Sequence, residues 1–164
     1  MPCRAAHALL WAFLFLPVAT SGHGRGPAIA PADSIDASAR PAAAVVDAFS
    51  AALMSLDVTK AGALLADDAL VLESGNAERS RTEYLAAHAG ADAIFLQQAS
   101  VRRIHRVARA AGNLAWVATE SEISTQRDGK PVVLRSTETM VLRRTTAGWR
   151  IVHIHWSSAR TPAA

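Results

Sequence analysis

The chain has 164 residues, a formal net charge of +3 and hydrophobic residues at 51% of its positions. This length is enough for one domain with a substantial core, and the charge excess is too small to favour a nucleic-acid-binding surface. Because Cys3 is the single cysteine, a disulfide within the chain and a metal site built from several thiolates are excluded.

An apolar run near the amino terminus predicts a secretory signal. Arg4 precedes the run, residues 8–19 are continuously apolar or small, and small residues follow up to Gly22. The run is shorter than the roughly 20 apolar residues that cross a bilayer. We therefore expect a cleaved signal at residues 1–22, a periplasmic or secreted product and no stable membrane insertion; an uncleaved anchor is the alternative. Removing this segment takes only Arg4 from the 17 basic residues, so the net charge falls to +2.

Residues 23–41 are rich in Gly, Pro, Ala and Ser and show no apolar period. This composition is typical of a flexible linker between the signal and a domain. One domain is therefore expected at residues 42–161.

The first half of this domain predicts helices. From Ala42, apolar residues such as Phe49 recur at the spacing of one buried helical face. Asp57 is expected to cap a second, short helix. Ser80 and Glu83 form a capping box, which predicts a third helix after Ser80.

The second half predicts strands. A short apolar stretch at 69–73 is a candidate first strand, and four longer β-rich runs lie at 101–107, 114–124, 132–143 and 149–157. Turn signals of hairpin length separate the long runs, and Asp128-Gly129 is the strongest of them. The expected fold is α+β, with a cone-shaped, curved antiparallel sheet wrapped around about three N-terminal helices. A cone of this kind has a concave interior, where small ligands bind.

Three segments resemble a known superfamily. They are the helix VVDAFSAAL, the D-x-x-x-x-x-x-L-x-x-D pattern from Asp57 to Asp67, and the ending ETMVLRRTTAGWRIVHIHWSS. Together they resemble the nuclear transport factor 2-like superfamily, and more narrowly its SnoaL-like members of unknown function. The ending is also similar to the association domain of calcium/calmodulin-dependent protein kinase II.

The resemblance implies a cone-shaped α+β fold that commonly dimerises through the open face of its sheet. It does not imply one chemistry, because the superfamily includes isomerases, cyclases, dehydratases, binding modules and oligomerisation domains. The kinase association domain lines its pocket with arginines, which an ungapped alignment places at Glu120, Met140 and Trp156. None of these is arginine, so that anion-binding pocket is not expected here.

Alternation divides the last strand into two faces. One carries Val152, Ile154 and Trp156, and the other carries Ile151, His153 and His155. If Trp156 lines the cone, as the resemblance implies, both histidines point away from it and are interface or structural residues. Two histidines at this spacing are alternatively two ligands of a metal, but no third ligand lies nearby, so no metal site is predicted.

Glutamates are the candidates for chemistry on the Trp156 face. Glu120 and Glu122 alternate on one strand, as Glu138 and Met140 do on the next, and all four are assigned to that face. A carboxylate in an apolar cone has a raised pKa and can act as a general base. Glu120 is expected to lie deepest and to be the base; Glu122 and Glu138 are alternatively solvated at the rim.

Two further residues are assigned to the mouth of the cone. Tyr84 and His88 lie one helical turn apart, and simple helix packing is the alternative interpretation. The basic cluster VRRIHRVAR is interpreted as a solvated strand face, with an anionic-surface patch as the alternative. The predicted ligand-binding residues are Tyr84, His88, Glu120, Met140 and Trp156.

Three functions follow as alternatives. The first is an exported domain that binds a small apolar or cyclic ligand. The second is an isomerase, cyclase or dehydratase that uses Glu120 as general base, and the third is a dimerisation or oligomerisation module. No nucleotide-binding motif is present, so no cofactor is expected. No nucleic-acid partner is expected either. The expected assembly is a homodimer.

Overall fold

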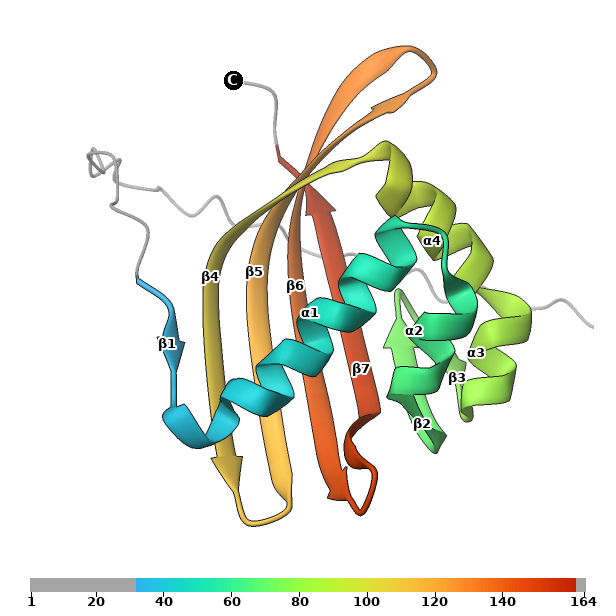
Figure 1. Cartoon of the computed structure of the whole chain (residues 1–164). Helices are drawn as coiled ribbons and strands as arrows, with labels where there is room; N and C mark the ends of the chain where they lie inside the picture. The colour runs from blue at the N-terminus through green and yellow to red at the C-terminus, as the bar shows by residue number, and fades with distance from the viewer. Residues whose placement is uncertain (1–31, 162–164) are drawn as a thin grey trace, which may run out of the picture.

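The computed structural model describes residues 32–161. The predicted signal and the first part of the predicted linker lie outside this range. Within it, four α-helices cover one face of a curved, unclosed seven-stranded sheet (Figure 1). The predicted α+β fold, with the sheet curved around the helices, is confirmed.

The elements have the following bounds. The helices are α1 (Arg40–Met54), α2 (Val58–Leu64), α3 (Arg81–Ala87) and α4 (Ala89–Gln98), with a 3₁₀ helix η1 (Ala37–Ala39) before α1. The strands are β1 (Ser34–Ile35), β2 (Leu65–Glu73), β3 (Asn76–Glu78), β4 (Ser100–Ala111), β5 (Leu114–Arg127), β6 (Lys130–Thr145) and β7 (Gly148–Arg160).

The predicted helix caps form. The side chain of Asp57 accepts a hydrogen bond from the backbone N–H of Lys60 at 2.9 Å, and that of Ser80 accepts one from the backbone N–H of Glu83 at 3.1 Å. The Glu83 carboxylate accepts in turn from the N–H of Arg79, one residue before the position of a standard capping box. Both helices therefore begin where the sequence predicts.

The sheet is mixed rather than wholly antiparallel. Its order is β1-β4-β5-β6-β7-β2-β3, and β4 to β7 form the predicted antiparallel meander. β2 pairs with β7 in parallel, and β1 pairs with β4 in parallel. These two pairings join segments that are distant in the sequence, so no hairpin turn signals them.

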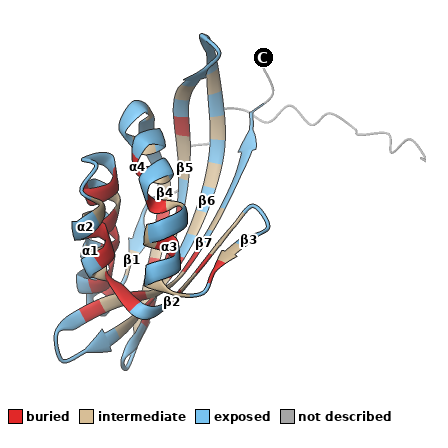
Figure 2. Ribbon diagram, turned by 90° about the vertical axis from the view of Figure 1, so that its right-hand side faces the viewer, coloured by how far each residue is buried: buried red, intermediate tan, exposed pale blue. Residues whose placement is uncertain are grey.

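The core lies between the helices and the inner face of the sheet (Figure 2). Phe49 and Leu53 of α1 are buried there, as are Leu142 of β6 and Ile151 and Ile154 of β7. Both isoleucines face the core because the pairing of β6 with β7 shifts by one residue beside Val152. This β-bulge reverses the alternation, so the assignment of Ile151 to the outer face is wrong.

The end of the segment predicted as a linker is part of the domain. β1 pairs with Val107 and Ala108 of β4, and the Asp33 carboxylate accepts a hydrogen bond from the backbone N–H of Arg106 at 2.8 Å. The prediction of a flexible linker up to residue 41 is therefore wrong from Asp33 onward. Composition rich in Pro, Ala and Ser does not reveal pairing with a distant sheet edge. Within residues 32–161, no helix has both the length and the apolarity to cross a membrane.

Candidate functional site

A cavity of about 600 Å³ lies between the helices and the inner face of the sheet. A cavity of this size accommodates a small organic molecule. Its apolar walls include Phe49, Leu53, Met54, Phe95, Leu96, Val101, Ile123 and Leu134. Its charged and polar lining includes Asp47, Glu73, Asp92, Arg103, Arg106, Thr119, Glu138 and five serines.

Four neighbouring strands each contribute one residue to a row across the cavity. Arg106 of β4 lies opposite Thr119 of β5, Thr119 lies opposite Glu138 of β6, and Glu138 lies opposite Trp156 of β7. Directly opposed residues point to the same face of a sheet, and all four line the cavity. We call these four residues the polar row.

Glu138 is the acidic member of the polar row. The indole N–H of Trp156 donates a hydrogen bond to its Oε2 at 2.8 Å. Burial raises the pKa of Glu138; the Trp156 hydrogen bond, the charge of Arg106 and a hydrogen bond with Thr119 oppose this only in part. The carboxyl group thus holds its proton more firmly than an exposed glutamate, which suits both hydrogen bonding to a ligand and proton transfer.

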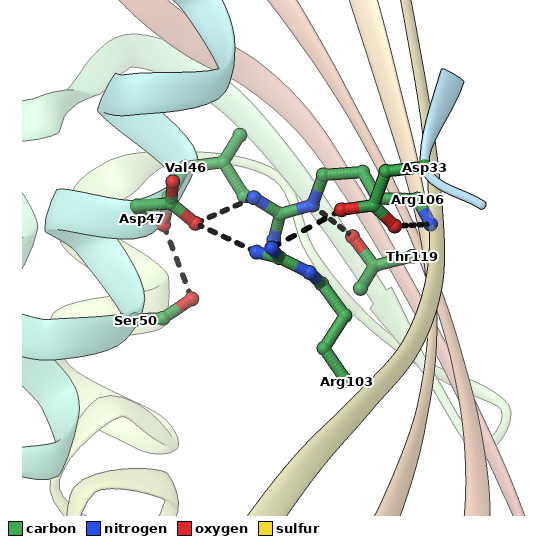
Figure 3. A network of polar contacts seen from close by, with 7 residues as sticks. All are labelled: Asp33, Val46, Asp47, Ser50, Arg103, Arg106 and Thr119. Carbon is green, nitrogen blue, oxygen red and sulfur yellow. Dashed lines mark hydrogen bonds and ion pairs between the residues drawn. The ribbon is translucent and has the colours of Figure 1, made fainter. Parts of the chain in front are cut away.

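Arg106 is the basic member of the polar row. Arg106 is only 4% exposed. Its Nε donates a hydrogen bond to Thr119 Oγ1 at 3.1 Å, and its Nη1 donates one to the carboxylate of Asp47 (Figure 3). The prediction that the basic cluster forms a solvated strand face is therefore wrong for Arg106. Strand alternation turns it inward, where a carboxylate compensates its charge, as burial of a guanidinium requires.

Two further carboxylates face the cavity from β2 and α4. Burial raises the pKa values of Glu73 and Asp92, and the charge of Asp92 raises that of Glu73 further. The Tyr84 hydroxyl donates to Asp92 Oδ2 at 2.9 Å. Burial, followed by the charge of Asp92, raises the pKa of Tyr84, so this residue acts as a neutral donor.

Two of the predicted ligand-binding residues share the inner face of the sheet. Trp156 lines the cavity, in the predicted position. Met140 also points inward, opposite Val117 and Ile154, but it is fully buried in the core and lies outside the cavity lining.

Glu120 lies on the outer face of the sheet, where it is exposed, and not in the cavity where it is expected. The register explains the difference. Asp128-Gly129 is a two-residue turn with Arg127 opposite Lys130, and counting back from this pair places Thr119, not Glu120, opposite Glu138. A shift of one residue moves a side chain to the other face, so the inward face of β5 carries Thr119.

Tyr84 and His88 line a separate, smaller cavity of about 240 Å³ between α3 and the β2–β3 hairpin. The His88 ring Nδ1 contacts the buried Glu78 carboxylate. Neither residue lines the larger cavity, because α3 packs against β2 rather than over the mouth. Tyr84 adjoins the larger cavity through its hydrogen bond to Asp92 and through its ring, which lies 6.5 Å from that of Phe49 and 6.3 Å from that of Trp156.

His153 and His155 lie on the outer face of β7. The Nδ1 atom of His153 is 3.0 Å from the carbonyl oxygen of Leu70, and the two imidazole rings are 6.5 Å apart. Within residues 32–161, no three or more His, Cys, Asp or Glu side chains are grouped so as to hold a metal ion. The interface role of the histidines stays a prediction.

The sequence reasoning missed most of the charged residues around the cavity. The Asp128-Gly129 turn was a usable signal for Thr119, because it determines the β5–β6 register. Asp47 and Asp92 come from helices, and Glu73 comes from β2, whose parallel pairing with β7 joins distant segments; these positions depend on tertiary packing, so no local pattern identifies them.

The comparisons with known proteins agree with this architecture. The family model described as a SnoaL-like domain matches residues 42–161. A candidate ketosteroid isomerase from Shewanella frigidimarina is 31% identical, with a TM-score of 0.68 over 71% of this chain and 94% of that chain. None of the curated proteins matches the sequence.

Two more distant structures share the fold. An NTF2-like protein with a cystatin-like fold from Novosphingobium aromaticivorans has 17% identity and a TM-score of 0.61, over 76% of this chain and 82% of its own. The calcium/calmodulin-dependent protein kinase II hub from S. rosetta has 19% identity and a TM-score of 0.62, over 76% and 98%.

The raised pKa of Glu138 makes stability depend on pH. A carboxyl group whose pKa rises on folding stabilises the native state while it is protonated. That contribution is complete below the unfolded pKa of about 4.5 and is lost as pH rises through the folded value. Glu138→Gln, which is always neutral, should therefore raise the free energy of unfolding at pH 8 and leave it nearly unchanged at pH 4.

Urea denaturation at the two pH values measures this difference. Glu120→Gln is the matched control, because the same change on the exposed outer face should have little effect at either pH. A Glu138→Gln variant that is destabilised at pH 8 would contradict the assigned environment of Glu138.

Proposed function

The chain belongs to the SnoaL-like family, and we propose that it is an exported member that binds a small organic ligand in the 600 Å³ cavity. Export rests on the predicted signal at residues 1–22. The apolar walls would enclose the body of the ligand, and Glu138 would anchor one polar group of it. The observation that carries this proposal is a half-buried carboxyl group, hydrogen-bonded to Trp156, on the wall of a largely apolar cavity.

The polar row suggests how the ligand is oriented. Trp156 stacks on Phe49, with ring centroids 6.3 Å apart and planes inclined by 24°, so its ring is held rigidly at the cavity wall. Its indole N–H holds Oε2 of Glu138. A ligand with a ring beside Trp156 and a hydroxyl or amine group beside Glu138 would match both surfaces.

A bulky residue in the cavity should abolish this binding. Ser136 lines the cavity, and its neighbour Thr137 is exposed and points to the outer face. The uncharged fluorophore N-phenylnaphthylamine serves as the probe. Ser136→Trp should weaken its binding about tenfold or more by filling the space a ligand needs, and Thr137→Trp should leave it unchanged.

Fluorescence titration of the two variants and the wild type measures the affinities. Equal probe affinity in the wild type and both variants would show that the probe binds outside the cavity. No binding to the wild type would contradict the proposed ligand-binding cavity.

Acid–base catalysis is the second candidate function. The relative that is 31% identical is described as a candidate ketosteroid isomerase. In such a reaction the ionised Glu138 would remove a proton from the carbon next to a carbonyl group and return it to another carbon of the same molecule. Asp92, whose pKa is raised by burial, would donate a hydrogen bond to the enolate oxygen when it is protonated.

Turnover of a β,γ-unsaturated ketosteroid to its conjugated isomer tests this function. Conjugation is followed by ultraviolet absorbance. Glu138→Gln should lower kcat by about 10²- to 10⁴-fold, the usual contribution of a general base, and Glu120→Gln should not change it. Turnover that survives Glu138→Gln would exclude Glu138 as the base.

The outer face of the sheet is the candidate dimer interface. Trp116 is 41% exposed there and lies opposite Val141, which lies opposite His153. An exposed indole on a sheet face is typical of an interface position. In the proposed homodimer, His153 and His155 would lie within the contact.

A charge at Trp116 should dissociate this dimer. Trp116→Glu would bury an uncompensated carboxylate between the sheets and should halve the mass measured by light scattering. Ile94→Glu is the control, because Ile94 is 55% exposed on α4, away from the sheet. A wild-type protein of monomer mass, or a Trp116→Glu dimer, would contradict the interface.

A further inference from the structure

Two arginines line the cavity, and aspartates on its border hold both of them. Arg103 Nη2 lies 3.1 Å from Oδ2 of Asp33, and Arg103 Nη1 lies 3.8 Å from Oδ1 of Asp47 (Figure 3). Asp47 also accepts the hydrogen bond from Arg106. The guanidinium groups therefore meet carboxylates of the chain itself at the edge of the cavity.

A guanidinium group in an apolar-walled cavity is otherwise a binding site for a carboxylate or sulfonate ligand. Arg106 is buried and fixed by Thr119 and Asp47, whereas the Arg103 side chain is 45% exposed. Arg103 is thus the cavity arginine with freedom to reach a ligand. The carboxylate within hydrogen-bond distance of Arg103 is that of Asp33.

Asp33 comes from outside the family match. The SnoaL-like model covers residues 42–161, and Asp33 directly precedes β1, the strand that adds to the sheet edge beside β4. Its Oδ1 accepts from the backbone N–H of Arg106, which leaves Oδ2 directed at Arg103. The Asp33 side chain therefore attaches the segment to the sheet and also pairs with the half-exposed Arg103.

We propose that Asp33 is a specificity-determining residue that, by occupying Arg103, reserves the cavity for ligands without a negative charge. This inference rests on the proposed ligand binding in the cavity. With both arginines compensated, the remaining ionisable groups in the lining are the carboxyls of Glu73, Asp92 and Glu138. These groups repel an anion and accept hydrogen bonds from neutral or cationic groups.

Two fluorophores of similar shape test the inference, the uncharged N-phenylnaphthylamine and the anionic anilinonaphthalene sulfonate. Asp33→Asn removes the charge, but the amide oxygen still accepts the hydrogen bond from Arg106. The variant should bind the anionic probe about three- to fivefold more tightly, the size expected for a half-exposed ion pair. Binding of the uncharged probe should change less than about twofold.

Asp36→Asn is the matched control. Asp36 lies on the same segment and pairs with Arg109 at 3.5 Å, but Arg109 does not line the cavity. The net charge changes equally in the two variants, so a general electrostatic effect would appear in both. A gain in anion affinity in both variants would overturn the specific role of Asp33.

Substitution of Arg103 separates charge from structure. Adding Arg103→Gln to Asp33→Asn should return the anionic-probe affinity to the wild-type value, and a gain that persists would overturn the proposal. Arg103→Gln alone should leave that affinity within about twofold, because Asp33 already holds the guanidinium; a marked loss would also overturn the proposal.

If the wild type binds neither probe, the proposed function fails. If it binds the uncharged probe and Asp33→Asn does not change the affinity for the anionic one, only this inference fails.

Discussion

The register of the β4–β7 meander is the constraint on which the cavity depends. The tight Asp128-Gly129 turn holds Arg127 opposite Lys130, and from that pair the ladder places Thr119 opposite Glu138. The neighbouring ladders then add Arg106 and Trp156 to the same row. A slip of one residue would send every member to the outer face. The hydrogen bond from Trp156 to Glu138 forms because this register places the two residues directly opposite each other.

The sequence predicts the fold well because periodicity, caps and turns are local signals. Asp57, Ser80 and the Asp-Gly turn all act where they are expected, and the position of Trp156 in the cavity follows from strand alternation and family resemblance. Glu120, the predicted base, lies on the outer face because strand alternation alone does not determine the faces of β5, whereas the register counted from the turn does. Asp33 falls in the predicted linker for a different reason: its partners Arg103 and Arg106 are seventy or more positions away along the chain, and no local pattern encodes these contacts.

The charges of the cavity are arranged in two groups with different consequences. On one side, Asp33 and Asp47 compensate Arg103 and Arg106, so this group is close to neutral. The acidic groups on β2, α4 and β6 have pKa values raised by burial. An apolar ligand with one hydrogen-bonding group suits such a cavity better than an anion does. A carboxyl group with a raised pKa is also what proton transfer at a carbonyl compound requires.

The central claim is that the Glu138 carboxyl group faces the cavity and is shielded from solvent, so that its pKa is raised. Carbon-13 NMR of the protein labelled at glutamate side-chain carboxyls tests it directly, with the Glu138 resonance assigned by its loss in Glu138→Gln. The predicted result is a titration midpoint above 4.5, the ordinary value, together with a pH-dependent shift of the Trp156 indole resonance. A midpoint at or below 4.5 would show a solvated carboxylate and would contradict the assigned site.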